Sequence, residues 1–400
     1  MPQTVPPEEL RVRIARLQEA LAAQGLDLAL IRQPADLYYY AGNLADGFLA
    51  VAVEGAPRFL VRRPQERLAA TETIWDLVFY RDFGDLQALL GDLSGSRPRA
   101  VGLELDVLPA ALYLRFQNKI FPGISLKDIS PLIRRQRMIK SSYELAQIRR
   151  AAAILDETFA EVPELLRPGL TELELSAAIE YRLRLRCHQG LIRLRNFSLE
   201  MFFGHVLSGH AGLEMAYTDT PSGGLGLGPA FPQGPSLKPL APGEPVIVDM
   251  GSCVNGYIAD MTRLFVLKDL PPEAWRAYDL TLELFHYFET ESRPGVRPGD
   301  LYQALCSRVE RAGLGEVFMG RGAEQVGFIG HGVGLELDEF PLISARFPYP
   351  LEADMVVAFE PKFFVPQVGL VGLEDTGRIT PNGVEWLTRV TREVIKVECP

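Results

Sequence analysis

Two aspartates in a hairpin pattern have the clearest potential for chemistry. They lie in the segment VIVDMGSCVNGYIADMTRLFV, where two apolar runs flank Asn255-Gly256, the strongest short signal of a β-hairpin. With the turn at this pair, Asp249 faces Thr262, and Asp260 lies on the same face, about 7 to 8 Å away diagonally. Solvated strand aspartates are the alternative, but the apolar flanks indicate burial, and buried carboxylates need a partner. The hairpin therefore predicts a cation site.

Two glutamates lie in a second hairpin pattern, MVVAFEPKFFVPQVGLVGLED. Glu360 and Glu374 are equally distant from Gln367, so a turn centred on Gln367 places them opposite one another. Opposed like charges destabilise a sheet unless a cation lies between them. The alternative interpretation is a polar sheet edge.

His331 is the fifth candidate ligand. It lies in GHGVGLELDE, among Gly330, Gly332 and Gly334, and this run of glycines predicts a loop into which bulky groups can approach. A single histidine of this kind is either a metal ligand or a structural residue.

Taken together, four carboxylates and one imidazole suit a divalent ion such as manganese, cobalt, iron or zinc rather than thiolate chemistry. Two such ions would neutralise the four carboxylates. A dinuclear centre lowers the pKa of a bridging water, and its second ion can act as a Lewis acid on a carbonyl group. The expected chemistry is hydrolysis.

The order of these residues resembles that of the pita-bread metallopeptidases, a family that includes methionine aminopeptidase, aminopeptidase P, prolidase and the metal-free creatinase. The similarity rests on GHGxGL around the histidine, FEP at the first glutamate and LED at the second. The N-terminal half is similar to the creatinase-type domain through RIARLQEALAAQGLDLALI and LYYYAGN, and IKSSYELAQIRRAA resembles the usual start of the catalytic domain.

The resemblance implies a role for each of the five residues. Asp249 would chelate one ion, Asp260 and Glu374 would bridge both ions, and His331 with Glu360 would hold the other. Glu360 would also act as the general base. Manganese is the first expectation, with cobalt, zinc or iron as alternatives.

The resemblance also implies two domains and a homodimer. Residues 1–135 would form an α/β creatinase-like N-terminal domain. Residues 136–400 would form an α+β pita-bread catalytic domain with a curved antiparallel sheet.

The chain departs from the family pattern where the substrate would be held. Asp338 stands where related peptidases carry a histidine, and Gly327 and Ala216 stand near two other usual histidine positions. Gly372 replaces an arginine that is frequent in aminopeptidase P. The usual groups donate hydrogen bonds to the tetrahedral intermediate, which an ionised aspartate cannot do.

Three residues are candidate substitutes for these lost groups. His205 and His210, in FFGHVLSGHAG, are expected to approach the centre and donate hydrogen bonds, or else to be surface residues. Asp338 could accept a hydrogen bond or pair with a cationic group of the substrate. We therefore count His210 and Asp338, with Glu360, as candidate catalytic residues.

The elements that position these residues can be read from periodicity and capping. Apolar spacing from Leu10 to Leu21 predicts a helix before a strand, and this α/β alternation continues to about residue 130. Beyond the boundary, four further helices are predicted, two of them from capping boxes. They span 142–159 (Ser141 and Glu144), 172–187 (Thr171 and Glu174), 272–290 and 299–312. The Gly/Pro-rich segment 219–245 predicts an active-site or dimer-contact loop rather than a phosphate loop.

Composition narrows the class of protein. The 400 residues carry a net charge of −10 without a basic run, which argues against nucleic-acid binding. No uninterrupted apolar stretch could cross a membrane, and no signal peptide is evident. Four dispersed cysteines, Cys187, Cys253, Cys306 and Cys399, fit reduced thiols in the cytoplasm.

The main functional prediction is a cytoplasmic dinuclear-metal hydrolase that resembles Xaa-Pro aminopeptidases and dipeptidases and cleaves a short peptide or small amide. One alternative is a relative on the same scaffold that acts on a small non-peptide substrate. The other is a catalytically silent metal-binding protein. The missing histidines leave these alternatives open.

Overall fold

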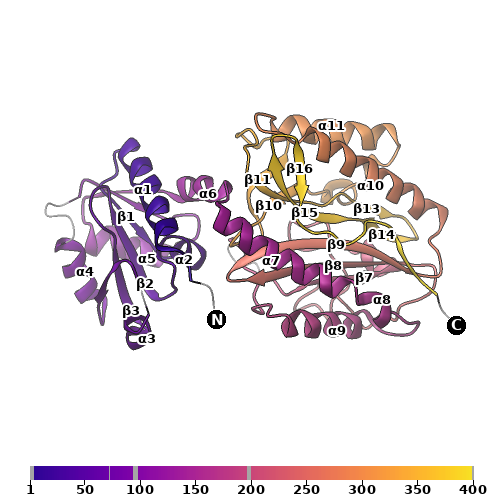
Figure 1. The fold of residues 1–400 in the computed structure, drawn as a ribbon, viewed down its shortest axis with the longest axis horizontal. Helices are drawn as coiled ribbons and strands as arrows, with labels where there is room; N and C mark the ends of the chain where they lie inside the picture. The colour runs from indigo at the N-terminus through magenta and orange to yellow at the C-terminus, as the bar shows by residue number, and fades with distance from the viewer. Residues whose placement is uncertain (1–3, 72, 93–97, 196–199, 399–400) are drawn as a thin grey trace. The chain divides into compact units, whose positions relative to one another are not determined.

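The computed structural model describes residues 4–71, 73–92, 98–195 and 200–398. The backbone divides into two compact units (Figure 1). The first extends to Arg137 and includes Arg195, and the second contains Met138–Leu194 and the described residues from Glu200 onward. Cys399 lies outside the described residues, within which Cys187, Cys253 and Cys306 are free thiols.

The first unit is a mixed α/β domain, as predicted. Its described strands form a six-stranded sheet in the order β4-β3-β2-β1-β5-β6. Strand β1 pairs in parallel with β5 and antiparallel with β2. In chain order the elements are α1 (Pro7–Ala23), β1 (Leu28–Ile31), α2 (Pro34–Ala41), β2 (Asp46–Ala52), β3 (Arg58–Arg63), α3 (Gln65–Ala69), β4 (Asp76–Phe79), α4 (Phe83–Asp92), β5 (Ala100–Leu103), α5 (Ala110–Arg115), the π-helical turn η1 (Phe116–Ile120), β6 (Ser125–Asp128) and α6 (Ser130–Met138).

The second unit is built on a curved sheet, as expected for a pita-bread domain. Its main path runs β11-β10-β12-β15-β9-β8-β7, with β16 beside β15 and β17 beside β9. Within the described residues this sheet is antiparallel except where β17 joins β9. The strands are β7 (Gly204–Ser208), β8 (Pro245–Val254), β9 (Tyr257–Leu267), β10 (Phe328–Gly332), β11 (Glu339–Ser344), β12 (Val356–Phe359), β15 (Glu374–Thr380), β16 (Gly383–Trp386) and β17 (Ile395–Val397), and a separate hairpin is formed by β13 (Lys362–Val365) and β14 (Gly369–Gly372).

Helices cover this sheet and bury its apolar side chains. Helix α7 packs on β8 and β9, α9 on β7, α10 on β13, β14 and β16, and α11 on β11. The helices are α7 (Ser142–Phe159), α8 (Val162–Leu165), α9 (Glu172–Leu185), α10 (Pro272–Glu291) and α11 (Pro298–Arg311), with short 3₁₀ turns η2 (Gly209–Leu213), η3 (Gly315–Val317) and η4 (Gly322–Glu324). None of the helices in the described part of the chain combines the length and apolar character needed to span a bilayer.

The helix predictions that rested on local chemistry are confirmed. Ser141 with Glu144 and Thr171 with Glu174 both form complete capping boxes at the starts of α7 and α9. Each box satisfies two backbone N–H groups that the first helical turn leaves without partners.

The loop predicted around His331 is wrong. His331 lies in strand β10, paired with Leu342 of β11 and Ala358 of β12. The flanking glycines allow close strand packing here, since a Cβ on Gly330 would lie 2.7 Å from the Ala358 carbonyl oxygen. The glycines serve close approach within a sheet rather than a loop.

Candidate metal centre

The first two carboxylates come from the β8–β9 hairpin, whose predicted register is confirmed. Asp249 pairs with Thr262 and Gly251 with Asp260, so both aspartates lie on one face of the sheet. Asn255 adopts a φ of 48° at the turn. Each aspartate is only 7% exposed, which confirms that they are not solvated strand residues.

The two glutamates flank the β13–β14 hairpin. Lys362 pairs with Gly372 in this hairpin, and the same register continues where Phe359 of β12 pairs with Asp375 of β15. The predicted turn centre, Gln367, has a φ of 63°.

Strand β15 also pairs with β9, which places Glu374 beside Thr262. Asp249, Thr262 and Glu374 therefore form a row across three neighbouring strands. The Thr262 hydroxyl donates a 2.9 Å hydrogen bond to Glu374 Oε2.

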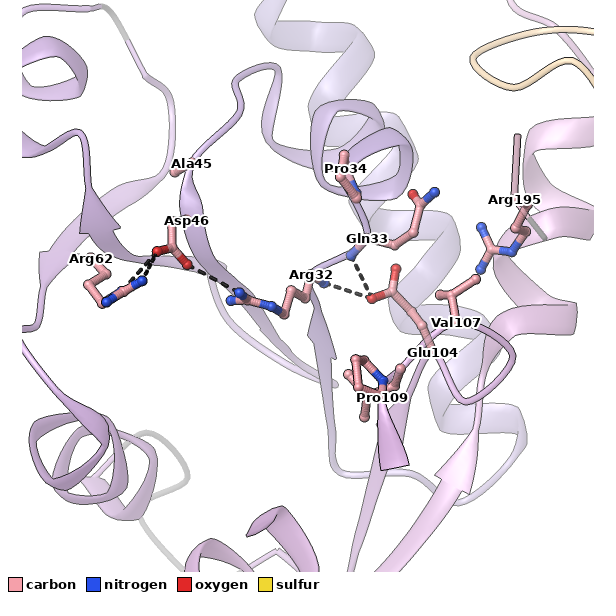
Figure 2. A pocket seen from close by; sticks show the side chains of 11 residues that line it. Arg32, Gln33, Pro34, Ala45, Asp46, Arg62, Glu104, Val107, Pro109 and Arg195 are labelled. Carbon is pink, nitrogen blue, oxygen red and sulfur yellow. Dashed lines mark hydrogen bonds and ion pairs between the residues drawn. The ribbon is translucent and has the colours of Figure 1, made fainter. Parts of the chain in front are cut away.

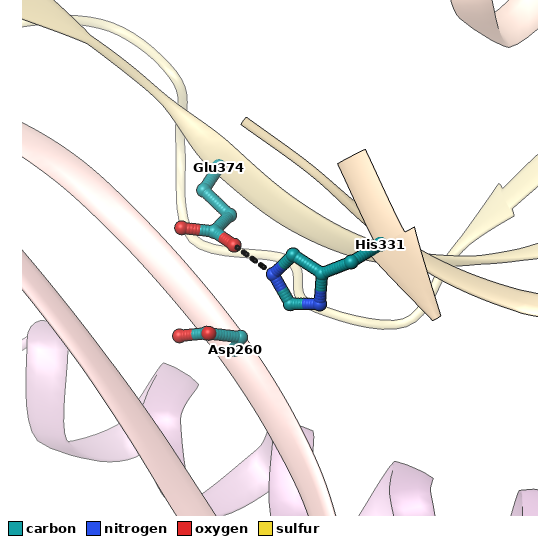
Figure 3. Close-up of side chains that lie close together, drawn as sticks. All are labelled: Asp260, His331 and Glu374. Atoms are coloured by element: carbon teal, nitrogen blue, oxygen red, sulfur yellow. Dashed lines mark ion pairs between the residues drawn. The ribbon is translucent and has the colours of Figure 1, made fainter. Parts of the chain in front are cut away.

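His331 brings its imidazole to the same cluster (Figure 3). Its Nε2 lies 3.6 Å from Glu360 Oε1 and 3.8 Å from Glu374 Oε1. Its Nδ1 lies 2.9 Å from the Leu337 carbonyl oxygen. Because a carbonyl only accepts hydrogen bonds, this contact places the proton on Nδ1 and leaves the lone pair of Nε2 facing the carboxylates.

Asp260, His331 and Glu374 form a group that can hold one metal ion. Each offers a ligand atom, these atoms lie within 4.8 Å of one another, and all three residues are buried. Glu374 Oε1 is a buried oxygen without a hydrogen-bond partner among the described residues. An orphaned oxygen beside a free imidazole nitrogen fits a divalent cation.

A lysine that the sequence analysis did not consider lies in the middle of the carboxylates. Lys362 Nζ is 3.0 Å from Asp249 Oδ2, 2.7 Å from Glu360 Oε2 and 3.2 Å from Glu374 Oε2. The side chain is 1% exposed. Glu360 and Pro361 lie between β12 and β13, so alternation along a single strand does not place Lys362 beside Glu360.

Ser222 is a second residue that the sequence analysis missed. Its hydroxyl donates a 2.8 Å hydrogen bond to Asp249 Oδ2. It belongs to the Gly/Pro-rich segment 219–245, which contains no named helix or strand before β8 begins at Pro245. The segment thus supplies a buried hydroxyl to the cluster.

The electrostatics differ between the two sides of the cluster. Burial acts to raise the pKa of Asp249, but the Lys362 ammonium, His205 and the Ser222 hydrogen bond together outweigh it and hold that pKa below its usual value. Burial and the neighbouring Asp249 charge raise the pKa of Asp260 to about 7. Burial and the Asp260 charge raise the pKa of Glu374 well above its usual value. Asp260 and Glu374 therefore tend to retain protons unless a cation balances their negative charge.

The pKa values of the two basic groups, Lys362 and His331, are both raised. Burial acts to lower the pKa of Lys362, but the carboxylates of Asp249, Glu360 and Glu374 raise it well above its usual value. Burial likewise acts against protonation of His331, while the charges of Asp338 and Glu360 raise its pKa.

A second layer of buried charge fixes the strands that carry the ligands. Arg263 Nη1 donates to the Thr262 and Glu374 carbonyl oxygens at 2.9 and 2.8 Å. Its Nη2 lies 2.7 Å from Asp375 Oδ1. The guanidinium thus ties β9 to β15 next to the cluster.

The candidate catalytic residues other than Glu360 lie in different settings. Asp338 is 37% exposed, and its Oδ1 lies 3.6 Å from His331 Nδ1. His210 is exposed in η2. His205 is buried on β7 opposite Asp249, and its Nδ1 has no hydrogen-bond partner within the described ranges. Burial lowers the pKa of His205 to about 4.

The three positions that lack the usual family side chains, Gly327, Gly372 and Ala216, have different surroundings. A Cβ at Gly327 would meet nothing within 4 Å. A Cβ at Gly372 would lie 2.6 Å from the Pro361 carbonyl oxygen and 2.7 Å from Lys362 Cγ, so the glycine allows both the facing backbone and the lysine stem to approach. Ala216 is partly buried in the loop after η2.

A separate pocket of about 620 Å³ lies in the first unit (Figure 2). Glu104 Oε2 accepts hydrogen bonds there from the backbone N–H groups of Arg32 and Gln33. Arg195, which also lines the pocket, forms an ion pair with Asp36. None of the predicted site residues lines it.

Comparisons with known proteins agree with this architecture. Residues 146–381 match the model of metallopeptidase family M24, and residues 13–139 match the creatinase/prolidase N-terminal domain. A Xaa-Pro dipeptidase from Pyrococcus furiosus is 26% identical over 96% of this chain and 100% of its own length.

Two solved structures are similar over nearly the whole chain. The prolidase from Pyrococcus horikoshii has a TM-score of 0.80 at 25% identity and covers 96% of this chain and 100% of its own. The dipeptidase PepE from Mycobacterium ulcerans has a TM-score of 0.81 at 25% identity and covers 99% and 100%. The chain therefore belongs to metallopeptidase family M24, with a creatinase/prolidase N-terminal domain before its catalytic unit.

Proposed function

We propose that this protein is a divalent-metal-dependent hydrolase that cleaves short peptides with proline in the second position. The observation that carries the proposal is the buried group of Asp260, His331 and Glu374, in which a free imidazole nitrogen faces a carboxylate oxygen without a partner. The relatives named Xaa-Pro dipeptidase, which align over 96% of the chain, support the substrate class.

Asp260, His331 and Glu374 would hold the ion. The Leu337 carbonyl fixes the His331 ring, and the Thr262 hydroxyl fixes the Glu374 carboxylate. A bound divalent ion would act as a Lewis acid on the substrate. It would also lower the pKa of a water molecule bound to it, so that hydroxide is available near neutral pH.

Glu360 would accept the proton from the attacking water. Its Oε2 is held by Lys362 at 2.7 Å, and its Oε1 faces His331 Nε2 at 3.6 Å. This arrangement leaves Oε1 directed toward the position where the ion would bind, as a general base requires.

Asp338 would pair with the cationic amino group of a dipeptide. It is the most exposed carboxylate near the cluster, and an ionised aspartate attracts a substrate ammonium rather than donating a hydrogen bond. His210 is the less supported candidate, because it is exposed.

Manganese is the expected ion, with cobalt, zinc and iron as alternatives, because all accept carboxylate and imidazole ligands. The prediction of two ions did not take Lys362 into account. The lysine leaves one position for an ion, between Asp260, His331 and Glu374. The homodimer and the cytoplasmic location stay predictions, and sedimentation would test the first.

A second candidate is hydrolysis of a small non-peptide substrate on the same scaffold. The ammonium of Lys362 among the ligands and the loss of the usual histidines at Gly327 and Asp338 favour this alternative.

The test is a substrate panel. Purified protein, loaded separately with Mn²⁺, Co²⁺, Zn²⁺ or Fe²⁺, is assayed on Xaa-Pro dipeptides, longer Xaa-Pro peptides and matched Xaa-Ala peptides. We expect cleavage of Xaa-Pro dipeptides that is lost in Glu360→Gln. Absence of cleavage with every metal would contradict the peptidase proposal and leave the second candidate or the silent metal-binding alternative.

A further inference from the structure

We propose that Lys362 permanently occupies one of two cation positions in the carboxylate cluster, so that the chain binds a single divalent ion. The inference rests on the proposed function only in that the other position takes a metal. It does not depend on the substrate.

The cluster has two sides, because the two carboxylate oxygens of each glutamate point in different directions. Glu360 and Glu374 each direct Oε2 toward Lys362 Nζ, at 2.7 and 3.2 Å. Each directs Oε1 toward His331 Nε2, at 3.6 and 3.8 Å. Both glutamates therefore bridge two cation positions, one of which contains the ammonium.

The ammonium is fully satisfied where it lies. A lysine ammonium has three donors, and the three nearby acceptors are Asp249 Oδ2, Glu360 Oε2 and Glu374 Oε2. Asp249 Oδ2 also accepts the Ser222 hydroxyl at 2.8 Å. This oxygen is thus engaged by two donors, and a metal ion could bind it only by displacing one of them.

The backbone around Lys362 holds the side chain in place. Its carbonyl accepts a 2.8 Å hydrogen bond from the Met319 N–H. The aliphatic stem passes over Gly372, where a Cβ would lie 2.7 Å from Lys362 Cγ. The residue opposite Lys362 thus lacks the side chain that would compete with its stem.

The net charge of the cluster also favours one divalent ion over two. Four carboxylates meet one ammonium in this cluster, so one divalent ion leaves a net charge of −1 with neutral His331. A second divalent ion next to the ammonium would be repelled by it and would lack a free Asp249 Oδ2.

The test counts manganese ions. Wild type, Lys362→Ala and the control Lys238→Ala are saturated with Mn²⁺ and passed through a desalting column, and bound metal per chain is measured by mass spectrometry. Lys238→Ala removes a different lysine–carboxylate pair, with Glu244, in the same unit. We expect one ion per chain in wild type and control, and two in Lys362→Ala, a doubling of capacity.

The outcomes separate the two proposals. Two ions in wild type, or the same number in wild type and Lys362→Ala, would overturn the role of Lys362. No ion in wild type would contradict the proposed metal-dependent function, while a gain of one ion in the variant would still support the role of Lys362.

A measurement on wild type alone covers the case in which Lys362→Ala fails to fold. Electron paramagnetic resonance of the Mn²⁺-loaded protein should give the spectrum of an isolated ion. A spectrum of two exchange-coupled ions would overturn the inference.

Discussion

The two units of this protein each bury a cluster of charged side chains, but the clusters differ in balance. In the first unit, Asp36 is fully buried and paired with Arg137 and with Arg195, the latter at 2.7 Å. In the second unit, four carboxylates lie around one lysine, Lys362, which contacts three of them. Buried charges with matching partners are structural, whereas a buried excess of carboxylates is balanced either by bound protons or by a cation from solution.

Glu104 shows how the first unit avoids such an excess. It lies beside Asp36, and burial together with the Asp36 charge raises its pKa well above the usual value. Its Oε2 accepts two backbone hydrogen bonds, from the N–H groups of Arg32 and Gln33 (Figure 2). The first cluster is thus matched by guanidinium groups and backbone donors of its own unit.

The largest expected effect comes from breaking the balanced cluster. Asp36→Ala deprives the buried guanidinium groups of Arg137 and Arg195 of a shared carboxylate. Removal of one partner from a buried ion pair costs about 3–5 kcal/mol, so the free energy of unfolding should fall by this amount in urea titrations. Manganese stoichiometry of the folded fraction should not change.

The matched control is Asp46→Ala in the same unit. Asp46 pairs with Arg32 and Arg62 but is 26% exposed, and exposed pairs contribute less than about 1 kcal/mol. Equal losses in the two variants would show that the Asp36 cluster is not specially important for stability.

Asp260→Asn should act in the opposite direction on the metal-free protein. It removes one uncompensated charge beside Asp249, so we expect the metal-free form to gain about 1 kcal/mol at pH 8. Manganese affinity, measured by calorimetry, should fall by at least about 100-fold, since loss of an outer partner already costs 10–100-fold. Retained manganese affinity would exclude Asp260 as a ligand.

A buried histidine without a carboxylate partner extends the comparison. His188 is 2% exposed, and burial lowers its pKa to about 4. Between about pH 6.5 and 4 the unfolded chain binds a proton there that the folded chain does not, so stability falls as the pH falls. We expect His188→Gln to reduce this loss by about 1–2 kcal/mol in urea titrations with EDTA at pH 7 and pH 5. An unchanged pH dependence would show that His188 is protonated in the folded state.

The smallest effect is expected at His210. Its side chain is exposed, so His210→Ala should change the free energy of unfolding by less than about 0.5 kcal/mol. Turnover and KM should also be unchanged. A clear fall in turnover would restore His210 as a catalytic residue.

Local sequence chemistry predicted much of the second unit correctly. The Asn255-Gly256 turn specified the β8–β9 register, and the symmetry about Gln367 specified the next hairpin. Turn geometry and strand alternation are local, so one sequence contains enough information to specify them.

The remaining features depend on contacts between distant segments. Ser222 reaches Asp249 from a loop 27 positions away, and the strand containing His331 is specified by its pairing with β11 and β12. Lys362 was missed for a different reason, because a lysine ammonium has no acceptor for a metal ion and was therefore not among the candidate ligands. It begins β13 after Glu360 and Pro361, which lie outside both β12 and β13, so alternation along one strand does not locate it.

The most direct test of the account is a crystal of the Mn²⁺-loaded protein, measured at the manganese absorption edge. The account predicts one anomalous peak, between Asp260, His331 and Glu374, with Lys362 Nζ still beside Asp249. Two peaks, with the lysine displaced from the carboxylates, would contradict it.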